Sequence, residues 1–450
     1  MCHFGRFIVY FGQFYLLFDE KTLKMTKNKE ILIVGFAIFS LFFGAGNLIL
    51  PPFLGANAGE QWWLVFLGFI ITAVFIPILG ILAHAKVQGT MYDLAKKVAP
   101  WFSSLYCVFM YLIAVTIPAP RTASVTHEMA IQPFFGTSSL LTSSLYFLLI
   151  FIFAVNRSKI INLIGKFLTP VIVFILLAVI ALASSGITHE MNLNTYGAPF
   201  ISGVLEGYQT FDAIGGVLIG AVIIISLNLK GYTSYGEIKT LITKAGFFAG
   251  SGLLLIYGGL LFSGAALSVS FAENSSRTDI LTSLSLQTLG TIGTSFLSIL
   301  VALACFTTAV GIVTGTSDYV KEIFKNSQKA YVVTAFISCV IGVLIGHFEV
   351  DFIIRAAIPA LMFIYPITIV LILLNVVSNK FASPFVFKGV VCVTFIFSIP
   401  DFLESLQIGG FLKPITYWIP LSSQSLGWLL PAILMFIGLN FYNHQKKKAH

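Results

Sequence analysis

Uncharged apolar runs of about 20 residues recur along this 450-residue chain and constrain its fold more than any other feature. A helical run of that length spans the hydrocarbon core of a bilayer, whereas buried helices of soluble proteins seldom exceed about a dozen residues without a charge. Hydrophobic residues make up 57% of the chain and charged residues 10%, more apolar surface than a soluble domain can bury. The sequence therefore predicts an all-α polytopic helical bundle in a membrane, since a transmembrane barrel would show short alternating strands instead.

About twelve transmembrane helices are expected. The first six are predicted at 31–52, 62–83, 101–120, 140–156, 163–184 and 204–228. The second six are predicted at 240–266, 288–316, 330–346, 352–377, 385–400 and 424–442. The longest polar stretches, including 268–287 and 88–100, have the length of loops, and the second also has the pattern of an amphipathic helix on the membrane face. We therefore expect one transmembrane domain over 25–450.

The net charge of +8 reflects basic residues in the short loops between apolar segments. Cytoplasmic loops of membrane proteins carry an excess of Lys and Arg. With a cytoplasmic N-terminus, all but four of the 26 Lys and Arg residues fall on the cytoplasmic side. The four outside are Arg121, Arg277, Arg355 and Lys413. We therefore expect both termini in the cytoplasm, and the positive charge needs no nucleic-acid partner to explain it.

Residues 1–24 stand apart from this pattern. They mix a short aromatic stretch with charged residues and contain no small-residue cleavage site. We expect Met25 to be the true start, because MTKNKE forms a compact basic leader directly before the first helix. Residues 1–24 are then a non-native extension, and the alternative is an interfacial N-terminal helix.

The sequence carries no motif for nucleotide-driven transport or for catalysis. It has no GxxxxGK[ST] phosphate loop, and its five Cys and seven His are scattered without metal-ligand spacing. We therefore expect no enzyme activity, no cofactor, no metal other than a coupling Na⁺ and no ATPase subunit, with energy drawn from an ion gradient. The rival classes are a membrane-embedded enzyme, which would need clustered catalytic groups, and a channel, which would need polar rings in a symmetric oligomer.

The first predicted span contains a cluster of small residues, Gly44, Ala45 and Gly46, before Asn47 and a Pro-Pro pair. A helix in lipid satisfies its own backbone groups, so a break is tolerated only where protein or a water-filled cavity takes over the hydrogen bonding. This cluster predicts exposed N–H and C=O groups at mid-depth. The alternative is a close helix-helix contact through the small residues.

The sixth predicted span has a second candidate break in EGYQTFDAIGG, which contains Glu206 and Asp212. A carboxylate at the centre of a membrane helix costs about 2.5–3.5 kcal/mol on insertion scales, so both should face the bundle interior and carry a role. The alternative is that either one caps a half-helix or pairs with a buried Lys or Arg. Two breaks five helices apart indicate an inverted-repeat transporter with its site near the midplane, where half-helix N-termini hold a carboxylate and freed carbonyls bind a cation.

The eighth predicted span places the carbonyl of Ala304 and the hydroxyls of Thr307 and Thr308 on nearly one face, through i, i+3 and i+4 spacing. Neutral oxygens of this kind suit sodium. The alternative is that the threonines bond back to a carbonyl of their own helix.

Four segments resemble the branched-chain amino acid carriers of the bacterial liv-II type, also called the branched-chain amino acid:cation symporter family. They are FFGAGNLILPPFLG (42–55), PRTASVTHEM (120–129), EGYQTFDAIGG (206–216) and FTTAVGIVTG (306–315). The resemblance covers essentially everything from Met25 onward. It implies a bacterial cell-membrane carrier that imports leucine, isoleucine and valine with Na⁺ or H⁺. It also implies the five-plus-five inverted repeat of sodium-coupled amino acid transporters, here 31–184 and 204–377 with two additional helices over 385–442.

The resemblance also implies roles for individual residues. Gly44 to Asn47 would cradle the substrate carboxylate, while Tyr208, Thr210 and Phe211 would line the substrate. The carbonyls of Ser40 and Phe43 would join Ala304, Thr307 and Thr308 in a sodium site. Glu206 and Asp212 depart from the neutral residues usual in the sodium-coupled relatives, so either is a candidate proton or coupling carboxylate. A cation-coupled transporter of another small amino acid or of a nucleobase on the same scaffold is the remaining alternative.

Overall fold

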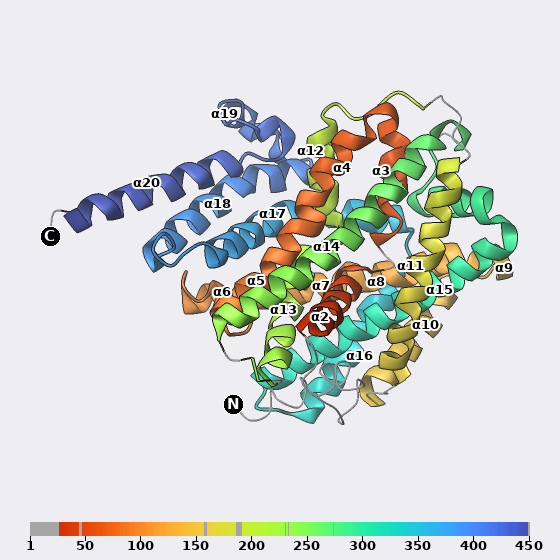
Figure 1. Ribbon diagram of the computed structural model, residues 1–450, viewed down its shortest axis with the longest axis horizontal. Coiled ribbons are helices and arrows are strands. Elements are labelled where there is room, and N and C mark those ends of the chain that lie inside the picture. The colour runs from red at the N-terminus through yellow and green to blue at the C-terminus, as the bar shows by residue number, and fades with distance from the viewer. Residues whose placement is uncertain are drawn as a thin grey trace.

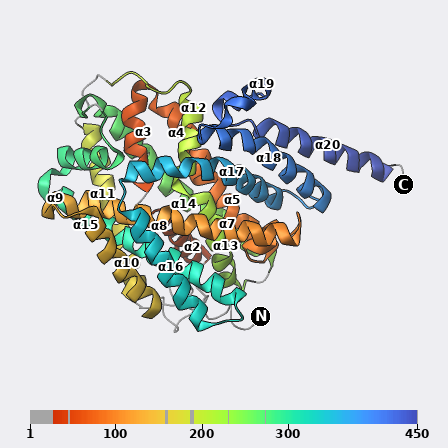
Figure 2. The ribbon, with the colours of Figure 1, turned by 180° about the vertical axis from the view of Figure 1, so that it is seen from behind.

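The computed structural model is a bundle of helices (Figures 1 and 2). It describes residues 27–44, 47–156, 160–185, 191–229, 231–232, 234–272 and 274–448. The prediction for residues 1–24 and the predicted site residues Ala45 and Gly46 lie outside these ranges. All regular elements in the described residues are helical, which confirms the all-α prediction.

The first half of the chain contains two interrupted helices with four continuous or kinked ones between them. Its elements are α2 (Lys27–Phe42), α3 (Leu50–Ala58), η2 (Gly59–Gln61), α4 (Trp62–Ile70), η3 (Ile71–Phe75), α5 (Ile76–Val87), α6 (Met91–Ala95), α7 (Pro100–Thr116), α8 (Pro118–Thr126), η4 (His127–Ile131), α9 (Gln132–Phe135), α10 (Ser139–Asn156), α11 (Ile160–Ser185), α12 (Pro199–Glu206), η5 (Gly207–Thr210) and α13 (Asp212–Leu229).

The second half consists of longer helices. Its elements are α14 (Tyr235–Ala266), η6 (Ser268–Ser270), α15 (Arg277–Ile323), α16 (Gln328–Gly346), α17 (Val350–Val376), α18 (Pro384–Ser405), η7 (Gly409–Leu412), α19 (Lys413–Thr416), η8 (Ser422–Gln424) and α20 (Leu429–Lys448). α20 extends away from the bundle beyond α18 and α17 (Figures 1 and 2).

Eight helical stretches in the described residues are long and apolar enough to cross a membrane. A ninth candidate is the pair formed by residues 199–210 and 212–224, which bends by 44° at its break. The chain is therefore a multi-pass membrane protein. The predicted spans at 31–52, 163–184 and 424–442 fall on α2 with α3, on α11 and on α20. α2 has 16 residues, and residues 169–185 of α11 form a shorter apolar helical stretch.

Two expected boundaries were wrong. The span predicted at 101–120 continues as one helical stretch to Phe135. α8 begins with Pro118 directly after the turn at Ile117, because a proline is tolerated in the first turn of a helix. The loop predicted over 268–287 is helical from Arg277 onward, because Ser276 and Asp279 form a capping box there, and Gly290 then kinks the helix with φ of +67°. Between the second and third spans, α6 confirms a short helix within 88–100.

The helices pack in groups. One hydrophobic core joins α2, α3, α4, α5, α13 and α14 with α11, and a second joins α8, α10, α15 and α16. A third core places α17, α18 and α20 against α5, α7 and α12. The first interrupted helix belongs to the first group, whereas the second lies in the third core through α12 and the start of α13 and joins the first only at the end of α13.

Glycines allow the backbone of α3 to approach α14 very closely. A Cβ added at Gly55 would lie 1.8 Å from the carbonyl oxygen of Leu261, and one added at Gly264 would lie 2.1 Å from that of Pro52. Real Cβ atoms do not approach an oxygen so closely, so only glycine fits at either position. The two helices are in backbone contact on this face.

Candidate substrate and cation site

The first interrupted helix opens just after α2. Phe43 and Gly44 are not helical, and the backbone N–H of Asn47 donates to the carbonyl oxygen of Gly44 at 2.9 Å. The carbonyl of Phe42, at the end of α2, accepts from the side-chain amide of Asn47 at 3.3 Å and from the hydroxyl of Tyr257 on α14 at 3.3 Å. Carbonyls at a helix C-terminus have no partner within the helix, and here two side chains supply donors beside the backbone N–H of Gly44, which donates at 3.0 Å.

The second interruption lies between α12 and α13. The 3₁₀ turn η5 follows α12 directly, and Phe211 then adopts the left-handed conformation with φ of +60° before Asp212 begins α13. A bulky side chain is rarely found in that region, and such strain concentrates at functional sites. The hydroxyl of Thr210 accepts from the backbone N–H of Asp212 at 3.2 Å and donates to the carbonyl of Gly207 at 2.9 Å.

The two interruptions meet through their side chains. The side-chain amide of Asn47 donates to Oδ1 of Asp212 at 2.9 Å, and both residues are buried. The other carboxylate oxygen of Asp212 has no hydrogen-bond partner among the described residues. The site therefore holds a carboxylate at the N-terminus of α13, with one oxygen that is buried and has no hydrogen-bond partner among the described residues.

Arg121 on α8 completes this group, and sequence reasoning missed it. Its side chain is only 3% exposed, although the residue was expected in an outside loop. Nη1 donates to the backbone carbonyl of Gln209 at 2.7 Å, and Nη2 donates to Oδ1 of Asn47 at 3.4 Å. The guanidinium carbon also lies 5.3 Å from the centre of the Phe211 ring. One buried cation thus contacts both interruptions.

Aromatic side chains surround the second interruption. The rings of Tyr208 and Tyr365, the latter on α17, stack with centres 4.4 Å apart. Both rings are buried. Of the residues expected to line the substrate, Asn47, Tyr208, Thr210 and Phe211 therefore lie on the two interruptions that meet here, while Tyr365 and Tyr257 were not predicted.

The residues expected to bind sodium do not come together through side-chain contacts. The hydroxyls of Thr307 and Thr308 donate to the carbonyl of Ala304 on their own helix, at 3.0 and 2.9 Å. The hydroxyl of Ser40 lies 3.2 Å from that of Thr169 on α11, and the ring of Phe43 stacks on Phe39. This arrangement matches the back-bonding alternative for the threonines, and the sodium site stays a prediction.

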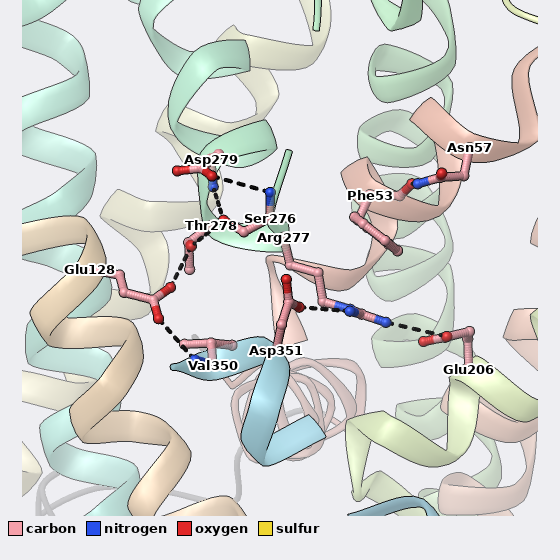
Figure 3. A network of polar contacts seen from close by, with 10 residues as sticks. All are labelled: Phe53, Asn57, Glu128, Glu206, Ser276, Arg277, Thr278, Asp279, Val350 and Asp351. Atoms are coloured by element: carbon pink, nitrogen blue, oxygen red, sulfur yellow. Dashed lines mark hydrogen bonds and ion pairs between the residues drawn. The ribbon is translucent and has the colours of Figure 1, made fainter. Parts of the chain in front are cut away.

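Glu206 has a partner that the sequence did not reveal. Its carboxylate forms an ion pair of 3.3 Å with Arg277, a residue that was counted among the outside loop cations (Figure 3). The same guanidinium pairs with Asp351 at 2.7 Å. The geometry matches the alternative in which Glu206 pairs with a basic residue, and it separates Glu206 from Asp212, which has no ion pair among the described residues.

The comparison with known protein families decides the identity. A family model described as "Branched-chain amino acid transport protein" matches residues 27–446. The chain belongs to this family. The family comprises transporters, so the expectation of a transporter rather than an enzyme is confirmed, as is the resemblance seen in the sequence.

Curated members of the family match over nearly the whole chain. The branched-chain amino acid transport system 2 carrier protein of Pseudomonas aeruginosa is 31% identical over 419 residues, which are 91% of this chain and 95% of that protein. The branched-chain amino acid permease BraB of Bacillus subtilis is 33% identical over 418 residues, covering 90% of this chain and 94% of the relative. The permease BrnQ of the same organism is 31% identical over 423 residues and covers 91% and 96%.

Solved transporters share the fold of this family member. Mhp1, a nucleobase-cation-symport-1 family transporter in a closed conformation, aligns with a TM-score of 0.55 and 12% identity over 91% of this chain and 93% of its own. A mutant of the manganese transporter of Eremococcus coleocola aligns with a TM-score of 0.55 and 16% identity, covering 94% and 96%. MhsT in complex with L-phenylalanine aligns with a TM-score of 0.52 and 13% identity, covering 91% and 98%. Identities this low relate the folds alone.

Proposed function

We propose that this chain imports leucine, isoleucine and valine across a bacterial cell membrane by symport with Na⁺ or H⁺. The observation that carries the proposal is the contact between Asn47 and Asp212, which brings two interrupted helices together beside a buried arginine. Interrupted helices that meet in this way form the substrate and ion sites of secondary transporters. The names of the relatives supply the class of substrate.

The proposed architecture is a five-plus-five inverted repeat of twelve spans in which α2 with α3 is the first helix and α12 with α13 the sixth. Helix packing supports it, because α2 and α3 pack on α14, and α12 and α13 pack in the same way on α4 and α5. Each interrupted helix thus lies against the second helix of the other repeat. Two inverted repeats that exchange their first helices would pack in this way. The distribution of Lys and Arg in the loops supports two cytoplasmic termini, even though Arg121 no longer counts among the outside residues.

In the proposed binding mode, the amino acid carboxylate lies against the first interruption, Gly44 to Asn47, with Arg121 as the nearby cation. Tyr208, Thr210 and Phe211 contact the substrate from the second interruption, and the Phe211 ring packs on the aliphatic side chain. Asp212 is the coupling group, since its open oxygen can take a proton, a sodium ion or the substrate ammonium. One methylene changes binding by only about 1–3 kcal/mol, so the three substrates should overlap.

Uptake into proteoliposomes tests the proposal. Labelled leucine, isoleucine and valine should each accumulate against their gradients when an inward Na⁺ or H⁺ gradient is imposed, and the gradient that drives accumulation identifies the coupling ion. Unlabelled alanine, phenylalanine and uracil should compete weakly. Accumulation of another small amino acid or a nucleobase with no uptake of the three branched substrates would establish the alternative carrier instead.

A further inference from the structure

Arg277 and Thr278 stand at the first turn of α15, where a capping box fixes their direction. The hydroxyl of Ser276 accepts from the backbone N–H of Asp279, and the carboxylate of Asp279 accepts from the backbone N–H of Ser276, both at 3.1 Å (Figure 3). Such reciprocal bonds hold the first turn of a helix in one conformation. The two side chains that follow the cap are therefore presented from a rigid base.

The guanidinium of Arg277 connects three other helices. Nη1 donates to Asp351 in the first turn of α17 at 2.7 Å, and Nη2 lies 3.3 Å from Glu206 at the end of α12. The guanidinium carbon lies 4.2 Å from the centre of the Phe53 ring on α3. Figure 3 shows the guanidinium between the two carboxylates, with α3 on the same side as Glu206. Both interrupted helices are thus joined to α15 and α17 by one side chain.

Thr278 makes a parallel connection to the third span. Its hydroxyl donates to Oε2 of Glu128 at 2.5 Å, and Oε1 of Glu128 accepts from the backbone N–H of Val350 at 2.8 Å. Glu128 belongs to η4, a π-helical turn, and such turns recur at functional sites. The contacts of Arg277 and Thr278 therefore bring together elements of all three hydrophobic cores.

The position of these contacts relates them to the substrate site. Glu206 directly precedes η5, the segment whose backbone Arg121 contacts, and Phe53 lies on α3 just after the first interruption. The contacts thus lie beside both interruptions, toward the face on which α3 ends and α12 begins. The two carboxylates remain partly accessible to solvent, because the side chains of Glu206 and Asp351 keep 23% and 20% of their surface exposed. Water can replace the guanidinium there at a lower cost than in a dry interior.

We propose that Arg277 and Thr278, with Glu128, Glu206 and Asp351, form a latch that closes the approach to the substrate site from the face where α12 begins. The latch opens when the Arg277 ion pairs break and α3 and α12 separate from α15 and α17. It closes again before the opposite face opens. Switching elements of this kind need two discrete arrangements, and a partly exposed ion pair across a packing boundary provides them.

Cysteine labelling tests the latch without reference to any substrate. The reporter is Gln209→Cys, because Gln209 is 4% exposed and lies on η5 behind the latch. The calibrator is Leu193→Cys, because Leu193 is 80% exposed shortly before α12 and labels from the same face. Full-length protein in proteoliposomes is treated with a membrane-impermeant maleimide. The labelling of the same protein without the introduced cysteine is subtracted as background.

Arg277→Gln should raise the labelling rate of the reporter about tenfold or more when the maleimide is added on the face that labels Leu193→Cys. The reason is that the closed state, which dominates the population of the parent, becomes a minor state once the ion pairs are lost. Glu206→Gln and Asp351→Asn should each raise the labelling rate of the reporter. Arg277→Lys should give an intermediate rate, because one ammonium cannot bridge two carboxylates as the planar guanidinium does. The matched controls are Arg355→Gln and Glu349→Gln, which remove exposed charges from the start of the same α17 and should leave the rate unchanged.

Two results would overturn the latch. One is a reporter rate within about twofold of the parent in Arg277→Gln, Glu206→Gln and Asp351→Asn alike, with Leu193→Cys labelling normally. The other is an equal rise in the Arg355→Gln control. Should Arg277→Gln fail to give a monodisperse protein, the two carboxamide variants decide the question, because they keep the size of the side chains. Absence of branched-chain amino acid uptake would refute the proposed function and leave these rates meaningful.

Discussion

The side-chain amide of Asn47 donates a 2.9 Å hydrogen bond to the carboxylate of Asp212, a residue 165 positions later in the chain. This bond links the two interrupted helices at a buried point. Because it uses one carboxylate oxygen and leaves the other open, Asp212 can keep its structural bond while it binds a cation or a proton.

Asp212→Asn should lower branched-chain amino acid uptake at least about tenfold, because an amide cannot accept a proton or neutralise a cation, while it can still accept from Asn47. The measurement is uptake as a function of external pH and of Na⁺. Wild-type pH dependence in Asp212→Asn would rule out this residue as the proton carrier. Glu349→Gln, which removes an exposed carboxylate, serves as the matched control.

Arg121→Lys should raise the KM for leucine about tenfold, because the ammonium keeps the charge but cannot contact both interruptions as the guanidinium does. A lost hydrogen bond to a charged group is worth roughly 1.5 kcal/mol or more, which corresponds to that factor. Initial uptake rates over a range of leucine concentrations give the KM. Arg355→Lys is the control, and an equal change in both variants would contradict a specific role for Arg121.

Thr308→Ala tests the predicted sodium site on α15. If Na⁺ binds at Ala304 and Thr308, the hydroxyl turns from its own helix to the ion, and its loss should raise the Na⁺ concentration needed for half-maximal uptake several-fold. Thr314→Ala is a matched control, since the Thr314 hydroxyl also donates to a carbonyl one turn earlier in α15, at 2.8 Å. An unchanged sodium response in Thr308→Ala would count against this site.

Gly264→Ala should destabilise the protein by about 1–3 kcal/mol, because the added methyl group would force the backbones of α14 and α3 apart. Gly236→Ala on the same helix α14 is the control, since a Cβ there meets nothing within 4 Å. Thermal unfolding in detergent gives the comparison. A melting temperature of Gly264→Ala equal to that of the control would contradict the close packing.

The sequence was sufficient to locate both interruptions, because small residues and carboxylates inside apolar spans are visible in a single chain. It did not reveal Arg121. The span was predicted to end at 120, whereas a proline in the first turn of α8 allows it to continue and carries the arginine inward. Arg121 was thus assigned to an outside loop, as was Arg277, which lies in the first turn of α15.

Contacts between segments far apart in the chain could not be predicted from local sequence patterns either. Arg277 and Glu206 pair across 71 residues, and no spacing in either segment indicates the other. The threonines of α15 illustrate a different limit. Positions i, i+3 and i+4 on one face suit a sodium ion, but the same spacing lets Thr307 and Thr308 bond to Ala304 of their own helix. Residue order alone does not distinguish the two outcomes.

The contact of Gly55 with α14 and of Gly264 with α3 has a mechanical consequence. With no side chains between the two backbones, α3 has no clearance in which to hinge by itself. Any displacement of α3 must carry α14 along as a rigid pair. α2 packs on α14 as well, where a Cβ added at Gly35 would lie 3.1 Å from the carbonyl oxygen of Ala245, so α14 is coupled to both halves of the first interrupted helix.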